Sequence, residues 1–274
     1  MRNVKFSLSY VIMVLVAIAW LLPLLWVLSS SLKTEAEVVA WPISWIPDAL
    51  TFENFSNVFN DAQAPVATWF FNSFLNASLH TVLTLALCSM SAYAFARFEF
   101  RFRDGLFYLM LATMMIPQVL NLVPLYSIVN EFGWVDTRWA LVVPGLASVF
   151  GIFLLRQFFL GVPKSLEEAA LIDGAGHFRV FFFIMLPMVK PGLIVLGLFS
   201  FLGNWNDYMW PLTVINSSDQ MTITIGLSLL KGTYNVLYAK MMTVTTLSII
   251  PVIILFIVAQ KYFMASSNMN SGIK

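Results

Sequence analysis

Long apolar runs, separated by short polar segments, make up most of this chain. A helix needs about 20 predominantly apolar residues to cross a bilayer core. Backbone groups in lipid must find hydrogen bonds within their own segment, and no repeating strand-length alternation is present, so helices are expected. The pattern predicts an all-α integral membrane protein with six transmembrane helices. These are expected near residues 8–28, 72–95, 106–126, 139–160, 190–210 and 241–262.

The predicted helices divide the chain into three parts. Residues 1–69 hold the first helix and an extracytoplasmic loop, residues 70–262 hold the other five helices, and residues 263–274 form a cytoplasmic tail. Prolines at or within the helices predict kinks, because each lacks a backbone N–H. Kinks suit a moving gate, but proline is common in membrane helices generally. The prolines concerned are Pro23, Pro117, Pro124, Pro144 and Pro251.

Composition agrees with a lipid environment. The chain is 59% hydrophobic and only 11% charged, with a mean hydropathy of +0.83, which is too apolar for a soluble domain. The single cysteine, Cys88, excludes a disulfide framework, and a net charge of +1 gives no reason to expect a nucleic-acid partner. The sequence has no Gly-x-x-x-x-Gly-Lys-Ser/Thr phosphate loop, so the chain does not hydrolyse nucleotides itself.

Lysine and arginine residues are distributed unevenly across the predicted helices. Eleven of the 15 fall on one side and four, namely Lys33, Arg138, Lys231 and Lys240, on the other. Cytoplasmic segments carry the excess of these residues. Both termini are therefore expected in the cytoplasm of a multi-pass membrane protein.

A cytoplasmic segment between the fourth and fifth predicted helices has clear helix-boundary signals. Ser165 is a candidate N-cap, and Glu168, three residues later, would complete a capping box. Gly174 supplies a left-handed stop, so a short helix is predicted from about Leu166 to Asp173. From the residues alone, this segment is either an ordered cytoplasmic loop or a surface for another protein, since its small residues allow close approach.

The same segment carries a long motif of fixed spacing: Glu168-Ala169-Ala170, three residues, Gly174, nine residues, Ile184, one residue, then Leu186-Pro187. This motif resembles the signature of permease subunits of binding-protein-dependent ABC importers. The resemblance implies a type I importer permease fold, with a coupling helix at residues 165–174 that docks on an ATPase. The implied coupling residues are Glu168, which would face a basic ATPase residue, Ala169, Ala170, Asp173 and the turn at Gly174.

The resemblance also implies partners. They are a second homologous permease subunit, two ATPase subunits that bind ATP and Mg, and an extracytoplasmic solute-binding protein, in the cytoplasmic membrane of a prokaryote. The chain itself would be neither an enzyme nor the holder of a cofactor. Further stretches resemble the maltose-type carbohydrate branch and indicate a sugar or oligosaccharide; glycerol-phosphate, amino acids and peptides remain alternative solutes. They are Ser30-Ser31-Leu32-Lys33, Phe71-Asn72-Ser73, Leu155-Arg156-Gln157-Phe158-Phe159, residues 204–212 and Gln260-Lys261-Tyr262-Phe263.

Polar residues inside or beside the predicted helices are candidates for the solute pathway. Such residues are costly in a bilayer and usually face a cavity or a partner helix. Planar amides beside aromatic rings suit polyols, although end-capping and polar contacts between helices explain the same residues. The candidates are Gln118, Asn121, Asn204, Asn206 and Asp207.

A long extracytoplasmic segment follows, from Asn216 to Lys240. Residues 222–226 alternate as a strand would, and long loops are often functional. By resemblance, the segment reaches into the binding protein; a re-entrant packing loop is the alternative. The candidate contacts are Lys231, Gly232, Thr233 and Tyr234.

Other functional classes find little support in the sequence. His80 and His177 have no second ligand at metal-binding spacing, so no metal site is expected. A secondary transporter would need ionisable residues deep in its helices, and His80 is the main one present. A membrane-embedded enzyme would need a catalytic constellation, which the predicted helices lack.

Overall fold

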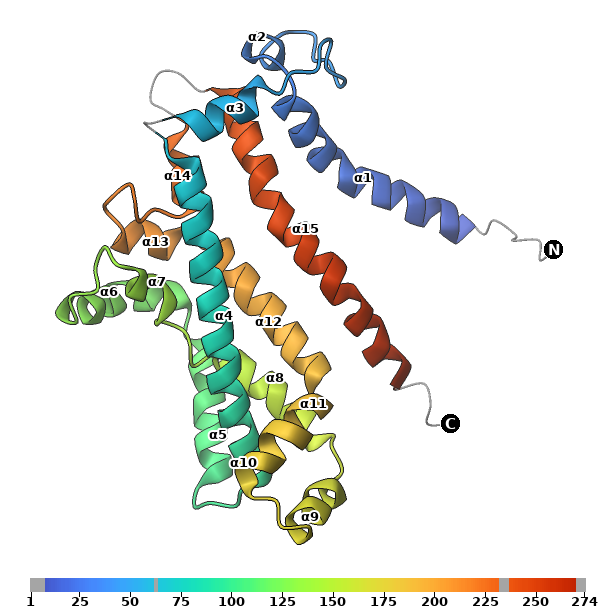
Figure 1. Ribbon diagram of the computed structural model, residues 1–274, viewed down its shortest axis with the longest axis vertical. Coiled ribbons are helices and arrows are strands. Elements are labelled where there is room, and N and C mark those ends of the chain that lie inside the picture. The colour runs from blue at the N-terminus through green and yellow to red at the C-terminus, as the bar shows by residue number, and fades with distance from the viewer. Residues whose placement is uncertain (1–7, 62–63, 232–236, 270–274) are drawn as a thin grey trace. The chain divides into compact units, whose positions relative to one another are not determined.

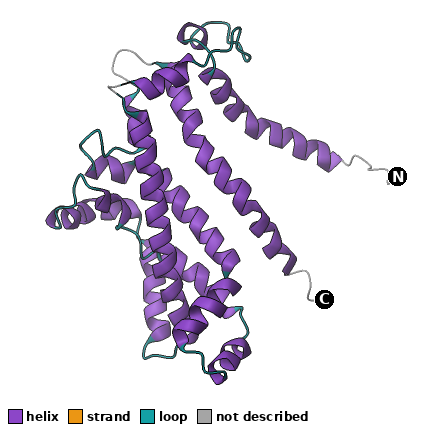
Figure 2. Ribbon diagram, in the orientation of Figure 1, coloured by secondary structure: helices purple, strands orange, loops and turns teal. Residues whose placement is uncertain are grey.

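A computed structural model describes residues 8–61, 64–231 and 237–269, with 262–269 described by backbone alone. Within these ranges every regular element is a helix (Figure 2), which confirms the predicted all-α class. Figure 1 shows the order of the elements. They are α1 Leu8–Ser31, α2 Glu35–Val38, α3 Glu53–Asn60, α4 Val66–Arg97, α5 Arg103–Ala112, η1 Thr113–Met115, η2 Gln118–Asn121, α6 Leu122–Glu131, α7 Arg138–Val142, α8 Val149–Leu160, α9 Lys164–Ile172, α10 His177–Val180, η3 Phe181–Met185, α11 Leu186–Met188, α12 Lys190–Trp205, α13 Met209–Val214, α14 Ile223–Leu229 and α15 Tyr238–Met269.

Three described helices, α1, α4 and α15, are long and apolar enough to cross a membrane unbroken. Three further candidate crossings are pairs of helices that meet at a bend of more than 40°. By length and composition, the total is up to six if each bent pair contributes one crossing, in agreement with the number predicted from hydrophobic length.

Each of the three bends lies at a proline. A bend of 94° separates η1 from η2 and holds Pro117, and one of 75° separates α8 from α9 and holds Pro163. The third, of 79°, separates α11 from α12, where Pro191 is the second residue. Proline lacks an N–H and disfavours helical backbone in the preceding residue. The kinks predicted from the sequence are confirmed at Pro117, and the other two bends lie at prolines outside the predicted set.

Two of the predicted spans are wrong as continuous helices. The span at 106–126 is interrupted at Ile116, which is extended (φ −84°, ψ 118°). The span at 139–160 is interrupted between α7 and α8, where Pro144 precedes Gly145 in the left-handed region (φ +83°). Apolar length predicts that a segment crosses the bilayer, but local backbone chemistry decides where its helix breaks.

One compact unit comprises Met1–Trp69 and Ile225–Ile250. Its polar contacts hold the segment after α1 against the start of α15. The carboxylate of Glu35 accepts hydrogen bonds from the backbone amides of Tyr238 (2.7 Å) and Ala239 (2.9 Å). Amides in the first turn of a helix have no partner within that helix. Glu35 therefore stabilises the beginning of α15 from outside.

The second compact unit comprises Phe70–Thr224 and Pro251–Lys274. Its core contains a buried aromatic cluster that joins α4, α8 and η3. The ring of Tyr93 lies 5.5 Å from that of Phe159 and 5.1 Å from that of Phe181, centroid to centroid. These spacings are typical of favourable aromatic contacts.

A glycine allows α8 and α12 to pack closely within the second unit. A Cβ atom on Gly192 would lie 2.6 Å from the ring of Phe158, closer than any real contact. Small residues at such crossings bring two helix backbones together, which is the usual source of packing energy between membrane helices.

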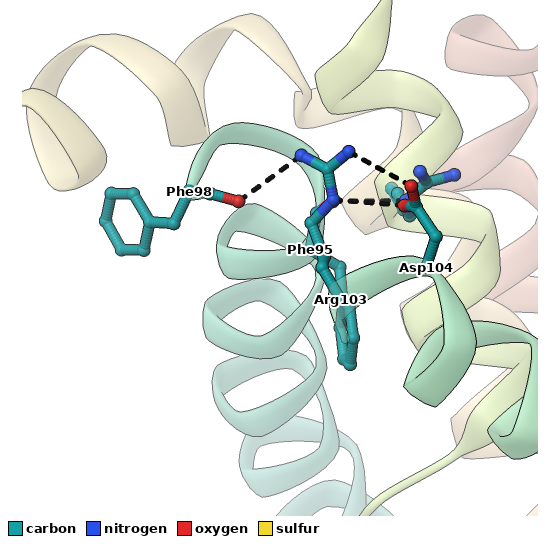
Figure 3. A network of polar contacts seen from close by, with 5 residues as sticks. Phe95, Phe98, Arg103 and Asp104 are labelled. Carbon is teal, nitrogen blue, oxygen red and sulfur yellow. Dashed lines mark hydrogen bonds and ion pairs between the residues drawn. The ribbon is translucent and has the colours of Figure 1, made fainter. Parts of the chain in front are cut away.

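The turn from α4 to α5 is held by a surface network (Figure 3). Nε of Arg103 lies 3.0 Å from a carboxylate oxygen of Asp104, and the same guanidinium donates to the carbonyl oxygen of Phe98 at 3.4 Å. All of these groups are accessible to solvent. Exposed ion pairs of this kind contribute little to stability.

Candidate functional site

The short helix predicted in the cytoplasmic segment is present as α9, but it begins earlier than expected. Pro163 occupies the N-cap position (φ −58°, ψ 132°), and no side chain of the described residues caps the helix. Ser165 is the second helical residue, so the predicted capping box between Ser165 and Glu168 is wrong. Proline fixes its own φ at about −65° and has no N–H to leave unpaired, so the chain can enter the helix at Pro163, before the serine is reached.

The end of α9 follows the prediction. Gly174 has φ +85°, in the left-handed region. Its amide donates to the carbonyl of Leu171 (3.1 Å), and the amide of Ala175 donates to that of Ala170 (3.0 Å). This pair of bonds is the Schellman arrangement, in which glycine satisfies the last carbonyls of a helix. The glycine stop is confirmed.

One face of α9 is open. Glu168, Ala169 and Asp173 are exposed, Ala170 is half-buried, and the neighbouring Ile172 is 85% exposed. The predicted coupling residues therefore lie mainly on the outer surface of this helix, beside a large exposed apolar side chain. Figure 1 shows α9 at the same end of the second unit as α10 and the turn between α4 and α5.

Glu167, next to the predicted Glu168, points inward, a role that the sequence reasoning missed. It is 9% exposed, and its Oε2 lies 3.2 Å from Nε of Arg97, an ion pair without hydrogen-bond geometry at that nitrogen. Tyr93 donates its hydroxyl hydrogen bond to Oε1. Arg97 also donates through Nη2 to the carbonyl of Val162 (2.5 Å). The sequence signal for this inward role is the pair of consecutive glutamates in one helix, because adjacent helical residues face different directions.

Four of the five predicted pathway residues line two adjoining cavities in the second unit. Gln118, Asn204 and Asp207 line a cavity of about 430 Å³, and Gln118, Asn121 and Asp207 line one of about 560 Å³. Asn206 lines neither; it is exposed and bonds its own helix at the carbonyl of Leu202 (3.0 Å). The sequence reasoning missed further polar residues around the smaller cavity. These are His80, Thr84, Ser148, Ser200 and Trp210.

The cavity wall is rich in side chains that bond the backbone of α7. Asn204 donates to the carbonyl of Leu141 at 3.0 Å. A ring nitrogen of His80 lies 2.8 Å from the carbonyl oxygen of Val142. The helix α7 ends early, so these carbonyls have no helical partner and need side chains instead. The bonds fix the wall of the cavity.

Two hydroxyls on the cavity wall differ from its other polar groups in their hydrogen bonding. Neither Thr84 Oγ1 nor Ser200 Oγ has a hydrogen-bond partner among the described residues, and both atoms are buried. A buried polar group without a partner is costly. Such groups are candidates to meet water or a polar solute.

Asp207 also stabilises the start of α13. Its carboxylate accepts from the backbone amide of Trp210 (3.3 Å), and its carbonyl accepts from the hydroxyl of Thr224 (2.7 Å). The residue thus has a structural role at the start of α13 as well as a place on the cavity wall.

The segment predicted to be extracytoplasmic contains a helix where a strand was expected. Residues expected to alternate as a strand begin α14, Ile223–Leu229, so that prediction is wrong. A five-residue alternation without a neighbouring strand cannot satisfy its backbone groups, whereas a helix can. Lys231 is exposed. The other predicted contacts, Gly232, Thr233 and Tyr234, lie outside the described residues.

Asp136, which no sequence motif marks, organises the loop before α7. Its Oδ2 accepts from the hydroxyl of Ser217 (2.6 Å), and its Oδ1 accepts from the amides of Ser217 (3.0 Å) and Asn216 (2.9 Å). These hydrogen bonds hold the pKa of the Asp136 carboxyl below its usual range, and the bond from the Ser217 hydroxyl has the largest effect. The loop before α7 is thereby tied to the one after α13.

Within the described ranges, no group of three or more His, Cys, Asp or Glu side chains is placed to hold a metal ion. The second unit combines the exposed helix α9 with the polar cavity lined in part by α4, η2 and α12.

Comparison with known proteins identifies the class. Residues 86–266 match the family described as "Binding-protein-dependent transport system inner membrane component". The diacetylchitobiose uptake system permease protein NgcG of Streptomyces coelicolor is 35% identical over 93% of this chain and 85% of its own length. The arabinooligosaccharides transport system permease protein AraQ of Halalkalibacterium halodurans is 36% identical over 89% of this chain and 88% of its own.

A solved structure supports the same fold. The chain aligns with a TM-score of 0.84 and 24% identity to a chain from the crystal structure of a bacterial ABC transporter involved in the import of the acidic polysaccharide alginate. The alignment covers 93% of this chain and 95% of that chain. This likeness establishes the fold.

The chain is therefore a multi-pass, all-helical permease component of an ABC importer. It belongs to the family of binding-protein-dependent transport system inner membrane components, as the motif from Glu168 to Pro187 predicted. Its part in the complex is that of a non-catalytic transport subunit.

Proposed function

We propose that this permease carries a sugar or oligosaccharide inward and is driven through α9 by a separate ATPase. The observation that carries the coupling role is the exposed face of α9, where Glu168 and Ala169 point outward beside the exposed Ile172. Relatives named for the uptake of diacetylchitobiose, arabinooligosaccharides and lactose support a carbohydrate solute.

The complex that we infer contains further subunits. Two ATPase subunits bind ATP and Mg, a second homologous permease completes the pathway, and an extracytoplasmic binding protein delivers the solute. Both termini lie in the cytoplasm, as the excess of Lys and Arg on that side indicates. In this arrangement α9 is cytoplasmic, where an ATPase can reach it.

The cavity supports a hydroxylated solute. Amide, hydroxyl and imidazole groups on its wall offer both donors and acceptors, and Trp210 adds an aromatic ring. Asn204 and the unpartnered hydroxyls of Thr84 and Ser200 are the groups that we assign to the pathway, together with Gln118 and Asn121. A sugar needs several hydrogen bonds at once, because each of its hydroxyls that loses water must find a hydrogen-bond partner in the protein.

Charge reversal at the outer face of α9 tests the coupling proposal. Glu168→Lys is expected to abolish uptake and binding-protein-stimulated ATP hydrolysis in the reconstituted complex, because a basic ATPase residue would meet a like charge. The permease should still reach the membrane, since Glu168 is exposed. Glu99→Lys, the same charge change at an exposed residue outside α9, is the control. Normal uptake and stimulation with Glu168→Lys would contradict the proposal.

The solute is tested by purifying the complex together with its binding protein. The binding protein is screened against mono- and oligosaccharides by thermal shift, with amino acids and peptides in the same panel. A stabilising carbohydrate is the expected result. Stabilisation by an amino acid or a peptide alone would reject the sugar assignment.

The segment after α14 is proposed to contact the binding protein. Lys231 is exposed and precedes the other three predicted contacts. Deleting residues 231–234 should lower binding-protein-stimulated ATP hydrolysis while leaving the basal rate unchanged. Unchanged stimulation would assign this segment a packing role instead.

A further inference from the structure

The buried cluster of Glu167, Arg97 and Tyr93 joins α9 to the cytoplasmic end of α4. The side chain of Arg97 is 4% exposed and that of Glu167 is 12% exposed. Among the described residues the carboxylate has two partners, the guanidinium of Arg97 and the hydroxyl of Tyr93. Removing Arg97 or Glu167 alone would leave the other charge buried without compensation, which is strongly destabilising.

Arg97 joins α4 both to α9, through Glu167, and to the bend that precedes α9. We call this contact the joint. Arg97 is the last residue of α4, and its Nη2 donates to the carbonyl of Val162, in the bend that leads into α9. Tyr93 sits one turn earlier in α4, within the aromatic cluster of Phe159 and Phe181. The joint is therefore anchored in the core of the second unit.

The helix that carries Arg97 and Tyr93, α4, has no residue that favours a kink. Among the described helices long enough to cross a membrane, α1 contains Pro23 and α15 contains Pro251, whereas α4 contains neither proline nor glycine. The remaining candidate crossings are broken pairs. Kinks in helices arise mainly at proline and glycine, so α4 is the crossing best able to move as a rod.

The same helix, α4, also forms part of the cavity wall. His80 and Thr84, both on α4, line the cavity of about 430 Å³. The distance along the helix from Arg97 to Thr84 is about 20 Å at 1.5 Å per residue. A displacement of the cytoplasmic end of α4 is thus conveyed to the cavity wall without an intervening hinge.

We propose that Glu167 is a positioning residue that locks α9 to α4, so that movement of α9 is passed to the cavity wall. Glu168 docks the partner, and Glu167 transmits the motion. This inference rests on the proposed coupling role of α9. It predicts that loss of the Glu167 carboxylate separates ATP hydrolysis from transport without separating the permease from its ATPase.

The test uses the complete importer in liposomes with its binding protein. Glu167→Gln is expected to lower the amount of solute imported per ATP hydrolysed by about fivefold or more, the size of a typical coupling effect. Asp104→Asn, which breaks the exposed ion pair with Arg103 at the same end of the protein (Figure 3), is the matched control and should leave this ratio unchanged.

A photo-crosslinker at the exposed Ile172 reports docking independently. In the parent and in Glu167→Gln it should reach the ATPase equally well. If the parent gives no crosslink, the proposed role of α9 in coupling fails. If crosslinking is normal and Glu167→Gln leaves the transport ratio unchanged, the locking role of Glu167 fails instead.

A milder variant covers the case in which Glu167→Gln does not assemble. Tyr93→Phe removes only the hydroxyl that donates to Glu167 and keeps the aromatic ring in its cluster. It should assemble and show a smaller drop in solute imported per ATP. An assembled Tyr93→Phe importer with the parent ratio would overturn the proposal.

Discussion

At the scale of single residues, two adjacent glutamates on α9 face opposite environments. Glu168 is exposed, whereas Glu167 is buried against Arg97. Successive side chains on a helix point about 100° apart, since 3.6 residues complete a turn. The motif found in the sequence includes only the outward glutamate. The inward one is recognised only when its partner on α4 is known.

Asp136 allows a prediction about pH. Hydrogen bonds lower the pKa of its carboxyl in the folded state, so the unfolded chain binds more protons near its ordinary pKa of about 4. The carboxylate therefore contributes stability that is fully present above about pH 5 and is lost as pH falls through the folded-state pKa. Thermal unfolding of the purified protein should show this loss between about pH 5 and 3, and less of it in Asp136→Asn.

Glu131→Gln is the control for this experiment. Glu131 is an exposed carboxylate at the end of α6. The variant should follow the pH dependence of the parent. An identical pH dependence in Asp136→Asn and in the parent would show that the network around Asp136 does not contribute to acid stability.

At the scale of elements, backbone chemistry sets the ends of α9. Pro163 is the residue just before the helix, and Gly174 makes the left-handed turn just after it. Both signals act within a few residues, which is why the end was predicted correctly. The helix begins two residues before the predicted Leu166, because serine and proline both favour helix entry and the proline comes first.

Gly174→Ala tests the left-handed stop. A Cβ atom there would meet nothing within 4 Å, so the cost of the change comes from the φ of +85° alone. The end of α9 should lose about 1 kcal/mol, seen as faster amide hydrogen exchange in its last turn.

Gly176→Ala is the matched control, since Gly176 is equally open but has φ −74°. It should leave the exchange rates of α9 unchanged. Equal exchange in Gly174→Ala and in the parent would contradict the strain argument.

At the scale of the whole molecule, the cavity collects polar groups from elements far apart in the sequence. Thr84 comes from α4, Gln118 from η2 and Ser200 from α12. None of these segments encodes the cavity by itself. Its wall exists because α7 ends early and leaves carbonyls that Asn204 and His80 satisfy.

Thr84→Val removes an unpartnered buried hydroxyl while keeping the side-chain shape. Stability without solute should rise by about 1 kcal/mol, because an unsatisfied polar group is no longer buried. Uptake by the reconstituted importer should fall, because the solute loses a hydrogen-bonding partner. Thermal unfolding and uptake assays measure the two effects.

Thr81→Val is the control for this change. The hydroxyl of Thr81 already donates to the carbonyl of Ala77 in its own helix (2.7 Å). Uptake should therefore stay close to that of the parent. Unchanged uptake in Thr84→Val would remove this hydroxyl from the proposed pathway.

The sequence by itself determined the class of protein, the number of up to six crossings, and the short helix between the fourth and fifth predicted spans with its glycine stop. These depend on apolar length and on backbone preferences that act over a few residues. The motif from Glu168 to Pro187 identified the family for the same reason, since all of its positions lie in one short segment.

Only the tertiary structure decided where the apolar segments break, which glutamate is buried and which polar residues share a cavity. Glu167 and Tyr93 are separated by 74 positions, yet they form one hydrogen bond. Packing brings such residues together, and a pattern in one segment carries no record of its partner in another. The sequence therefore located α9, whereas its connection to α4 and the cavity could be found only in the folded chain.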